Sequence, residues 1–354
     1  MAPAPDVEAL LRRHNPVLVI YPHDTKRLRP GAHKLLGVQR WGDYHPCSAP
    51  FFLDRVVQRD RPKPYLSGLL DLFRQDNRPA GYETIAARVR DKVVAGNITD
   101  TRLWELDLAR IPSQRERRAW SRYADLLTEP RRRYECVVYA RWCEGASGTA
   151  LQYWYLYVYN DFWNNHEADW EMATIELDAG GAPRRMAISC HHGGYRLPWP
   201  EAPKHGDQPV IRVARGCHGG YFGYRRDGFD PRALARTLHL PSALRFLGPL
   251  LRAMPPLPGL RDHPPADPGW PDDAAAPDSH RGVRIVPELR FFPDQPPEPD
   301  SPEWPDWWWL HYEGKWGSWH SRISGTMGVD SPWGPAKQTA RWNDPVRWIE
   351  ERTQ

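Results

Sequence analysis

Between residues 135 and 222 the sequence repeats one pattern: short runs of β-branched and aromatic residues, each bounded by Gly, Asp or Asn. Such runs are typical of β-strands, and few helical signals stand between them. The spacing therefore predicts an antiparallel sheet or sandwich rather than βαβ units. The predicted strands are residues 136–142, 150–159, 170–177, 185–191 and 210–214.

The residues before this β-rich part show a different pattern. A short helix is expected over 7–13 and a strand over 16–21, and helical periodicity is present over 66–74 and 101–127. We therefore divide the chain into a helical and loop region, residues 1–134, and a core, residues 135–354. Segment 16–21 is a candidate strand for that core.

An insertion is expected within the core, over residues 230–280. Asp230 and Pro231 are typical of a helix start, and a leucine stripe follows to residue 251. From about residue 255 the chain is rich in Pro, Asp and Ala, which predicts a surface excursion that proteases cut first. Residues 283–348 return to strand-like and aromatic residues. The fold class predicted is mainly β (α+β), an antiparallel β-sandwich with N-terminal helices and this insertion.

Composition sets the broad class. No apolar run approaches the roughly 20 residues of a membrane-spanning helix, and the first six residues lack the features of a signal peptide. Five cysteines in 354 residues do not form a disulfide framework, so a cytoplasmic setting is expected.

The net charge of +4, with both signs interspersed, does not favour a nucleic-acid partner. The 18 tryptophans form either a broad core, the favoured interpretation, or an aromatic-lined pocket.

The segment from His166 to Glu171 is the strongest candidate site. Asp169 and Glu171 alternate on the predicted strand, so they share one face with the apolar residues that follow. Carboxylates on an apolar face are costly to bury unless a cation or strong donors neutralise them. His166 could complete a cluster of ligands. The pattern predicts a metal or acid–base site.

The ends of two more predicted strands carry histidines. His191 and His192 lie within Ser189–Gly194, and His218 precedes two glycines, which permit sharp turns and close approach. The link 178–184 carries a hairpin signal, which would place His191 opposite the start of the Asp169 strand. Mixed His and carboxylate ligands suit Zn, Mn, Fe or Ca, so a divalent cation of unknown identity is the expected cofactor.

Each of these residues also has a structural interpretation. A histidine at a strand end is more often a hydrogen-bonding cap than a ligand. The two carboxylates could instead form ion pairs with Arg212 or Arg215. Cys190 and Cys217 are interpreted as small core residues rather than as thiolates. Asp43 and His45 are compatible with a ligand or base role and, equally, with a structural turn before Pro46. The ion-pair interpretation of the carboxylates and both interpretations of Asp43 and His45 remain open at this point.

Four pieces of the sequence, in order, resemble the family named for vacuolar protein sorting-associated protein 62. They are His166–Glu171, Ser189–Gly194, Val210–His218, and Lys315–Gly317 with Gly334–Pro335. The resemblance covers roughly residues 150–345. Two positions depart from the family pattern: Ala168 replaces a Gly, and Met172 replaces a frequent His. The family name implies no chemistry.

The Asp-Trp-Glu strand is also similar to that of necrosis- and ethylene-inducing-like toxins, over about six residues and a nearby His-x-Gly-Gly. Those proteins are secreted β-sandwiches that bind a divalent cation through His and carboxylates and recognise sphingolipid sugars. The resemblance implies a similar arrangement here, with a carboxylate and a His meeting at a cation on the edge of a sandwich. The N-terminal sequence does not favour a secreted toxin.

Two functions follow from these observations. The first is a cytoplasmic metal-dependent enzyme that acts on a small organic substrate by hydrolysis or by cyclisation or elimination. Its metal ligands would be His166, Asp169, Glu171 and His218, and its acid–base residues His166, His191 and Glu171. Tryptophans between 304 and 319 would wall its pocket. The alternative is a Ca-dependent module that binds a carbohydrate or lipid headgroup without catalysis.

Overall fold

The structure is a computed structural model. It describes residues 6–20, 45–60, 80–108, 135–160, 166–190, 193–214, 218–222, 283–317 and 331–353. The predicted insertion over 230–280 and the predicted helical segments 66–74 and 109–127 lie outside these residues.

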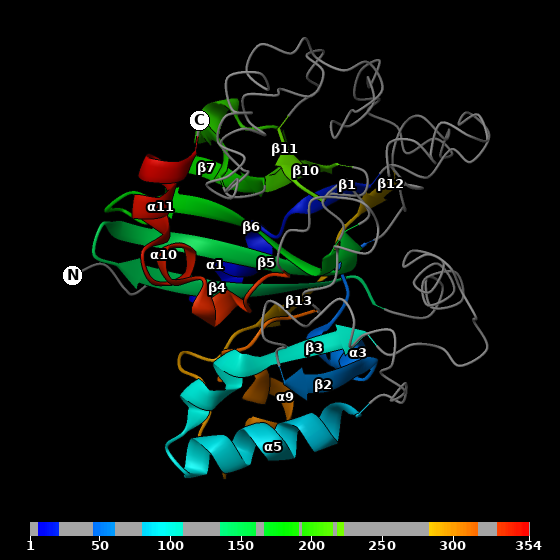
Figure 1. The fold of residues 1–354 in the computed structure, drawn as a ribbon. Helices are drawn as coiled ribbons and strands as arrows, with labels where there is room; N and C mark the ends of the chain where they lie inside the picture. The colour runs from blue at the N-terminus through cyan, green and yellow to red at the C-terminus, as the bar shows by residue number, and fades with distance from the viewer. Residues whose placement is uncertain are drawn as a thin grey trace, which may run out of the picture.

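The largest element is a six-stranded sheet at the centre of the molecule (Figure 1). Every neighbouring pair in it is antiparallel except β13–β4, which is parallel. The sheet order is β13 (Glu288–Phe291), β4 (Val137–Gly145), β5 (Gly148–Asn160), β6 (His166–Leu177), β7 (Pro183–Cys190) and β8 (Gly193–Pro198). These strands confirm the predicted β pattern, including the hairpin between β6 and β7.

A second sheet of five strands lies beside the first. The order is β11 (Gly220–Tyr221), β10 (Gln208–Val213), β1 (Val17–Ile20) and β12 (Val283–Ile285), with β9 (Lys204–His205) paired to β10. β1 runs parallel to β10, with Val17 opposite Val210, and antiparallel to β12. The N-terminal segment thus occupies an inner position of this sheet. The mainly β fold class is confirmed, although two strand pairs in the molecule are parallel.

The expected helix over 101–127 is wrong where the structure describes it. Residues Trp104–Leu108 form strand β3, which pairs antiparallel with β2 (Val56–Asp60) in a separate two-stranded sheet. Leu106 and Leu108 are buried at alternate positions, a spacing that suits a strand once a partner is available. A 3-10 helix, η2 (Ile98–Leu103), precedes the strand.

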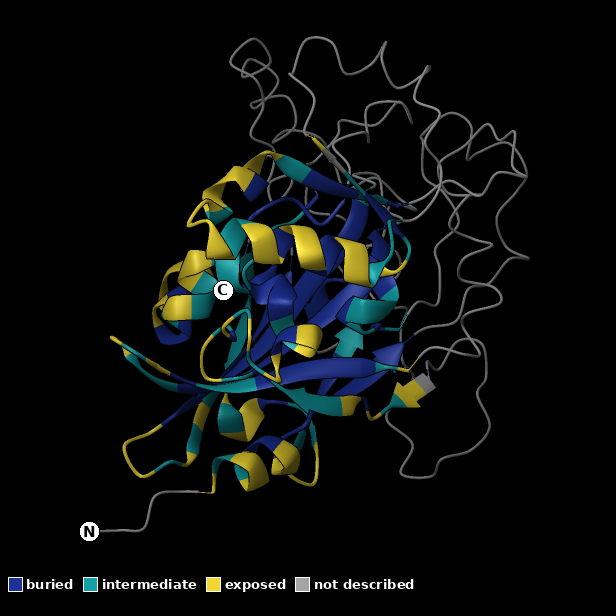
Figure 2. Cartoon of the chain, turned by 90° about the horizontal axis from the view of Figure 1, so that it is seen from below, coloured by how far each residue is buried: buried dark blue, intermediate teal, exposed yellow. Residues whose placement is uncertain are grey.

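Helices surround the sheets, and Figure 2 shows exposed residues on them while the central strands are buried. The expected helix over 7–13 is confirmed as α1 (Val7–Arg13), where the side chain of Asp6 accepts a hydrogen bond from the Ala9 amide at 3.0 Å. Among the described residues of segment 283–348, the expected strand-like character holds for β12 and β13 alone. The other helical elements are α3 (Ala49–Leu53), α5 (Tyr82–Val94), η4 (Trp199–Glu201), α9 (Trp304–Trp307), η6 (Trp308–Leu310), η8 (Pro335–Lys337), α10 (Thr339–Asn343) and α11 (Pro345–Arg352).

The tryptophans of the C-terminal part pack as core. Trp308, Trp309 and Trp316 are at most 1% exposed. The ring of Trp170 stacks on Trp309 and meets Trp316 edge-on, at centroid distances of 5.9 and 5.2 Å. Successive strand residues point to opposite faces, so Trp309 and Trp316 lie on the face away from Glu171. The expectation that they wall the site is therefore wrong, and Trp319 lies outside the described residues.

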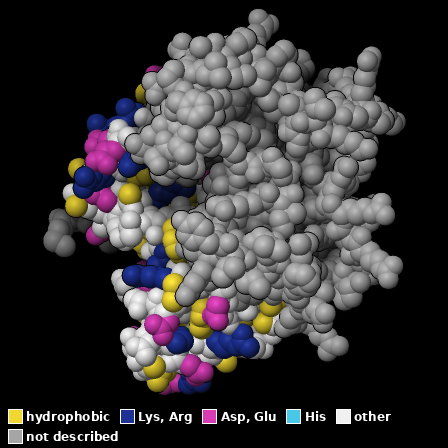
Figure 3. Space-filling model, in the orientation of Figure 1, with side chains coloured by type: hydrophobic (Ala, Val, Ile, Leu, Met, Phe, Trp, Pro, Cys, Tyr) yellow, Lys and Arg dark blue, Asp and Glu magenta, His cyan; other side chains and the backbone are white. Residues whose placement is uncertain are grey.

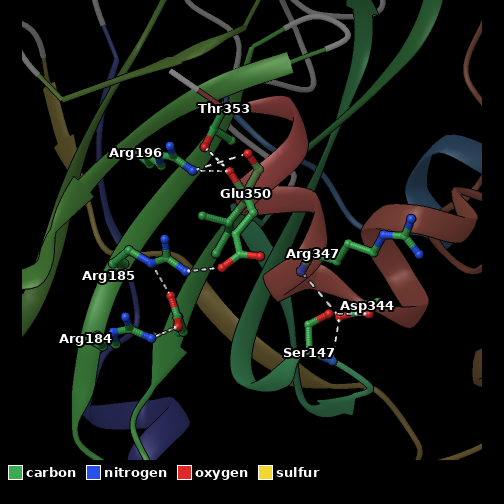
Figure 4. A network of polar contacts seen from close by, with 10 residues as sticks. Ser147, Arg184, Arg185, Arg196, Asp344, Arg347, Glu350 and Thr353 are labelled. Carbon is green, nitrogen blue, oxygen red and sulfur yellow. Dashed lines mark hydrogen bonds and ion pairs between the residues drawn. The ribbon is translucent and has the colours of Figure 1, made fainter.

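Helix α11 docks on β7 and β8 through polar contacts (Figure 4). The guanidinium of Arg196 donates to the carbonyls of Ile349 and Glu350 at 3.0 and 3.4 Å. At the other end, the Asp344 carboxylate accepts from the Arg347 amide at 3.3 Å and from the Ser147 hydroxyl at 2.8 Å. The helix is thus held at both ends.

The surface visible in Figure 3 carries basic and acidic side chains that alternate over the described residues. Ion pairs such as Lys92–Asp100, with 2.7 Å between Nζ and Oδ2, account for part of this alternation. Among the described helices, none is both long and apolar enough to span a membrane.

Candidate functional site

The site strand β6 presents its carboxylates beside tyrosines of β5. In the register of these strands, Tyr155 lies opposite Glu171 and Tyr157 lies opposite Asp169. Partners in an antiparallel pair share a face of the sheet, so these four side chains gather on one side. All four residues are buried, with 7% of Asp169 and 4% of Glu171 exposed.

Asp169 is the centre of the polar contacts. Its Oδ2 accepts a hydrogen bond from the side-chain amide of Asn160 at 3.0 Å and faces His218 Nδ1 at 3.1 Å. Its Oδ1 faces His166 Nε2 at 3.6 Å. The two histidines therefore flank the two oxygens of one carboxylate, and the structure brings together three of the four predicted ligands.

His218 reaches this carboxylate because the chain turns sharply between β10 and β11. Its backbone is left-handed, with φ of 57°, and two glycines follow it. A Cβ at Gly219 would lie 2.7 Å from the sulfur of Cys190, and one at Gly220 would lie 3.1 Å from Ile188. Glycine is thus required for the close approach to β7. The imidazole lies flat on the ring of Tyr157, with centroids 4.0 Å apart.

Burial and hydrogen bonding set the charge of this pair. Burial raises the pKa of Asp169, but hydrogen bonds from His166 and His218 outweigh it and hold the pKa well below its ordinary value. Burial also lowers the pKa of His218, an effect that Asp169 partly offsets. The favoured state is an ionised Asp169 and a neutral His218 whose Nδ1–H donates to it. In that tautomer Nε2 carries the lone pair.

Glu171 is held separately from Asp169. The hydroxyl of Ser189 donates to its carboxylate and accepts from the Met172 amide at 2.7 Å. Sequence reasoning missed a further charged residue here: Arg341 of α10. Burial lowers the pKa of Arg341, while the nearby Glu171 and Asp169 raise it. Arg341 lies 170 positions after Glu171 in the sequence (341 − 171), and no motif connected the two.

Several predicted residues fall outside the site or outside the described chain. His191, His192, Arg215, Cys217 and Asp43 lie outside the described residues. Their expected roles stay predictions.

Other predicted residues are described, and their contacts are as follows. His45 Nδ1 lies 3.1 Å from the carbonyl of Pro46. The guanidinium of Arg212 donates to the carbonyl of Phe222 at 2.9 Å. The thiol of Cys190 donates to the Tyr221 hydroxyl at 3.3 Å within a small apolar cluster, in agreement with its interpretation as a core residue.

The donor types fit a divalent cation, but the described residues supply a partial set. The 3.6 Å between His166 Nε2 and Asp169 Oδ1 matches two donors on one tetrahedral ion, which lie about 3.4 Å apart. Neutral imidazole and carboxylate are also the ligands that Zn, Mn and Fe accept. Within the described residues, no three His, Cys, Asp or Glu side chains converge on one ion position.

No protein-family profile and no curated protein matches the chain. Similar solved structures include necrosis- and ethylene-inducing protein 2 from the causal agent of cocoa's witches' broom disease, 22% identical over 22% of this chain and 39% of that one, with a TM-score of 0.21. NLPPya in complex with glucosamine is 22% identical over 25% and 44% of the two chains, with a TM-score of 0.22. The non-toxic HaNLP3 protein is 19% identical over 23% and 40%, with a TM-score of 0.20.

The chain thus spans less than half the length of these structures. At these scores the similarity defines neither the fold nor the function of this chain.

Proposed function

We propose that this chain is a cytoplasmic, metal-dependent enzyme that acts on a small organic substrate, by hydrolysis or by cyclisation or elimination. The observation that carries the proposal is the buried Asp169–His218 pair, in which Nδ1 lies 3.1 Å from the carboxylate. A carboxylate that fixes one ring nitrogen directs the other toward a metal ion or a reacting proton. The proposal includes membership of the family named for vacuolar protein sorting-associated protein 62.

Each residue has a role in this proposal. His166 and Asp169 would hold the cation, with Glu171 and His218 as further ligands or as the general base. A bound divalent cation supplies Lewis acidity and lowers the pKa of a coordinated water. His218, neutral because of its burial, accepts a proton at Nε2, and Asp169 stabilises the imidazolium that results. The tyrosines of β5 and the burial of the site exclude bulk water.

Metal analysis of the purified protein tests the proposal. The double variant Asp169→Asn, Glu171→Gln should lose the metal that the wild type retains and should lose turnover in a substrate screen. Its fold should persist in circular dichroism, because Asn and Gln keep the shapes of the two side chains. Glu176→Gln is the matched control, since Glu176 is a buried carboxylate of the same strand that pairs with Arg184 at 2.9 Å.

The control variant should retain metal at the wild-type ratio. A wild type without metal, or a double variant with full metal content, would refute the metal-dependent enzyme. The Ca-dependent binding module is the second candidate function, and the observation that favours it is the same cation site. Its expected sugar-stacking surface is not supported, because Trp308, Trp309 and Trp316 are buried in the core.

A further inference from the structure

Alternate tyrosines of β5 line the face that carries the two carboxylates. Tyr153, Tyr155 and Tyr157 are all buried, at 0, 3 and 0% exposure. The hydroxyl of Tyr153 donates to the carbonyl of Leu11 in α1 at 3.1 Å. Within the described part of the chain, the hydroxyls of Tyr155 and Tyr157 have no hydrogen-bond partner. The three tyrosines therefore differ in whether the hydroxyl group has a hydrogen-bond partner.

The neighbouring carboxylates have other donors. Asp169 accepts from Asn160 and His218, and Glu171 accepts from Ser189. A tyrosine hydroxyl is protonated at neutral pH, so both groups can act as hydrogen-bond donors. A buried donor without a partner is unfavourable, so each such group calls for an explanation, and a ligand that accepts the hydrogen bond is one.

We propose that the hydroxyls of Tyr155 and Tyr157 bind the substrate, by donating to an uncharged hydroxyl or carbonyl oxygen. The reaction that follows binding depends on the proposed function. The binding site itself is inferred from the two tyrosines alone. Where no cation is bound, an anionic oxygen would meet the carboxylates of Asp169 and Glu171 on the same face of the sheet, whereas a neutral acceptor avoids that repulsion. Because the ring of Tyr157 lies flat on His218, an oxygen held there is beside the proposed base.

A first experiment measures thermal stability with EDTA present, so it requires neither metal nor turnover. Tyr155→Phe and Tyr157→Phe remove an unsatisfied hydroxyl and should leave Tm unchanged or raise it by about 1–3 °C. Tyr153→Phe is the matched control, since it removes a hydroxyl that is hydrogen-bonded to Leu11, and it should lower Tm. Losses at Tyr155 and Tyr157 as large as that at Tyr153 would overturn the proposal.

A second experiment, also with EDTA present so that no cation can attract an anion, uses two probes of nearly equal size, acetamide with a neutral carbonyl and acetate with a charged carboxylate. Acetamide binding, followed by NMR titration, should weaken by about 3- to 10-fold for each hydroxyl removed. Acetate should bind more weakly than acetamide to the wild type. Equal affinity of the Tyr155→Phe, Tyr157→Phe double variant and the wild type for acetamide, or tighter binding of acetate, would refute the assignment. If the purified wild type contains no metal, the metal-dependent enzyme is refuted, whereas the stability and binding results for the tyrosines keep their meaning.

Discussion

Ala168, in the middle of the site motif, has a left-handed backbone with φ of 52°. This region is unfavourable for residues with a Cβ by about 1–2 kcal/mol and is readily adopted by glycine. The sharp local conformation lies between His166 and Asp169, which come within 3.6 Å of each other. A glycine at this position would adopt the same conformation without that cost.

We predict that Ala168→Gly is nearly neutral for stability. Relief of the backbone strain offsets the loss of one buried methyl group, about 0.8 kcal/mol, and the greater freedom of glycine in the unfolded chain. Ala173→Gly is the matched control, because Ala173 is equally buried in the same strand. It should cost roughly 1.5–2 kcal/mol. Urea denaturation measures both, and equal losses would contradict the strain.

At the scale of elements, helix α11 packs against the part of the six-stranded sheet that includes β7 and β8. Its buried residues Val346, Trp348 and Ile349 face the sheet, and Arg185 connects Glu176 of β6 with Glu350 of the helix. Arg196 satisfies carbonyls of its last turn, which have no partner within the helix. Packing and capping together hold the helix in place.

Asp344→Ala should destabilise the protein by about 1–2 kcal/mol, because it removes the N-cap of α11 and the hydrogen bonds to Ser147. Glu351→Ala is the comparison, since Glu351 forms an exposed ion pair with Arg347 at the surface. That variant should have little effect. Chemical denaturation of both variants checks the prediction, which fails if the two losses are the same.

At the scale of the whole molecule, three histidines from different parts of the fold, His14 and His218 buried and His311 half-buried, respond to pH in the same direction. Burial lowers the pKa of each, opposed in part by hydrogen bonding. They are His14 beside Asp207, His218 beside Asp169 and His311 beside Pro297. Each binds a proton more readily in the unfolded chain, whose histidines titrate near pH 6.5.

The free energy of unfolding should therefore be largest above about pH 6.5 and fall as the pH decreases toward 5, by up to about 1.4 kcal/mol per pH unit for each proton taken up. Urea denaturation at pH 7.5 and 5 measures this change. His14→Gln and His311→Gln should each reduce the slope. A stability that does not change between these pH values would contradict the buried neutral histidines.

The sequence determined four strands of the larger sheet, β4 to β7, and the face on which the carboxylates lie. Both depend on local properties: β-branched and aromatic residues at period two, and turn residues such as Gly180 and Gly181 between β6 and β7. For the same reason, the alternation of Asp169 and Glu171 predicted a shared face before their neighbours were known.

Tertiary structure alone decided which partners these residues meet. Trp104–Leu108 became a strand because β2 pairs with it, and the tryptophans became core because Trp170 offered a surface on the opposite face from the carboxylates. His218 was a candidate because two glycines follow it, but its contact with Asp169 depends on the packing of the two sheets against each other. Arg341 belongs to helix α10, and nothing in the site motif indicated that its charge would lie near Glu171 and Asp169. Contacts between distant segments depend on packing and strand pairing, which local sequence patterns do not encode.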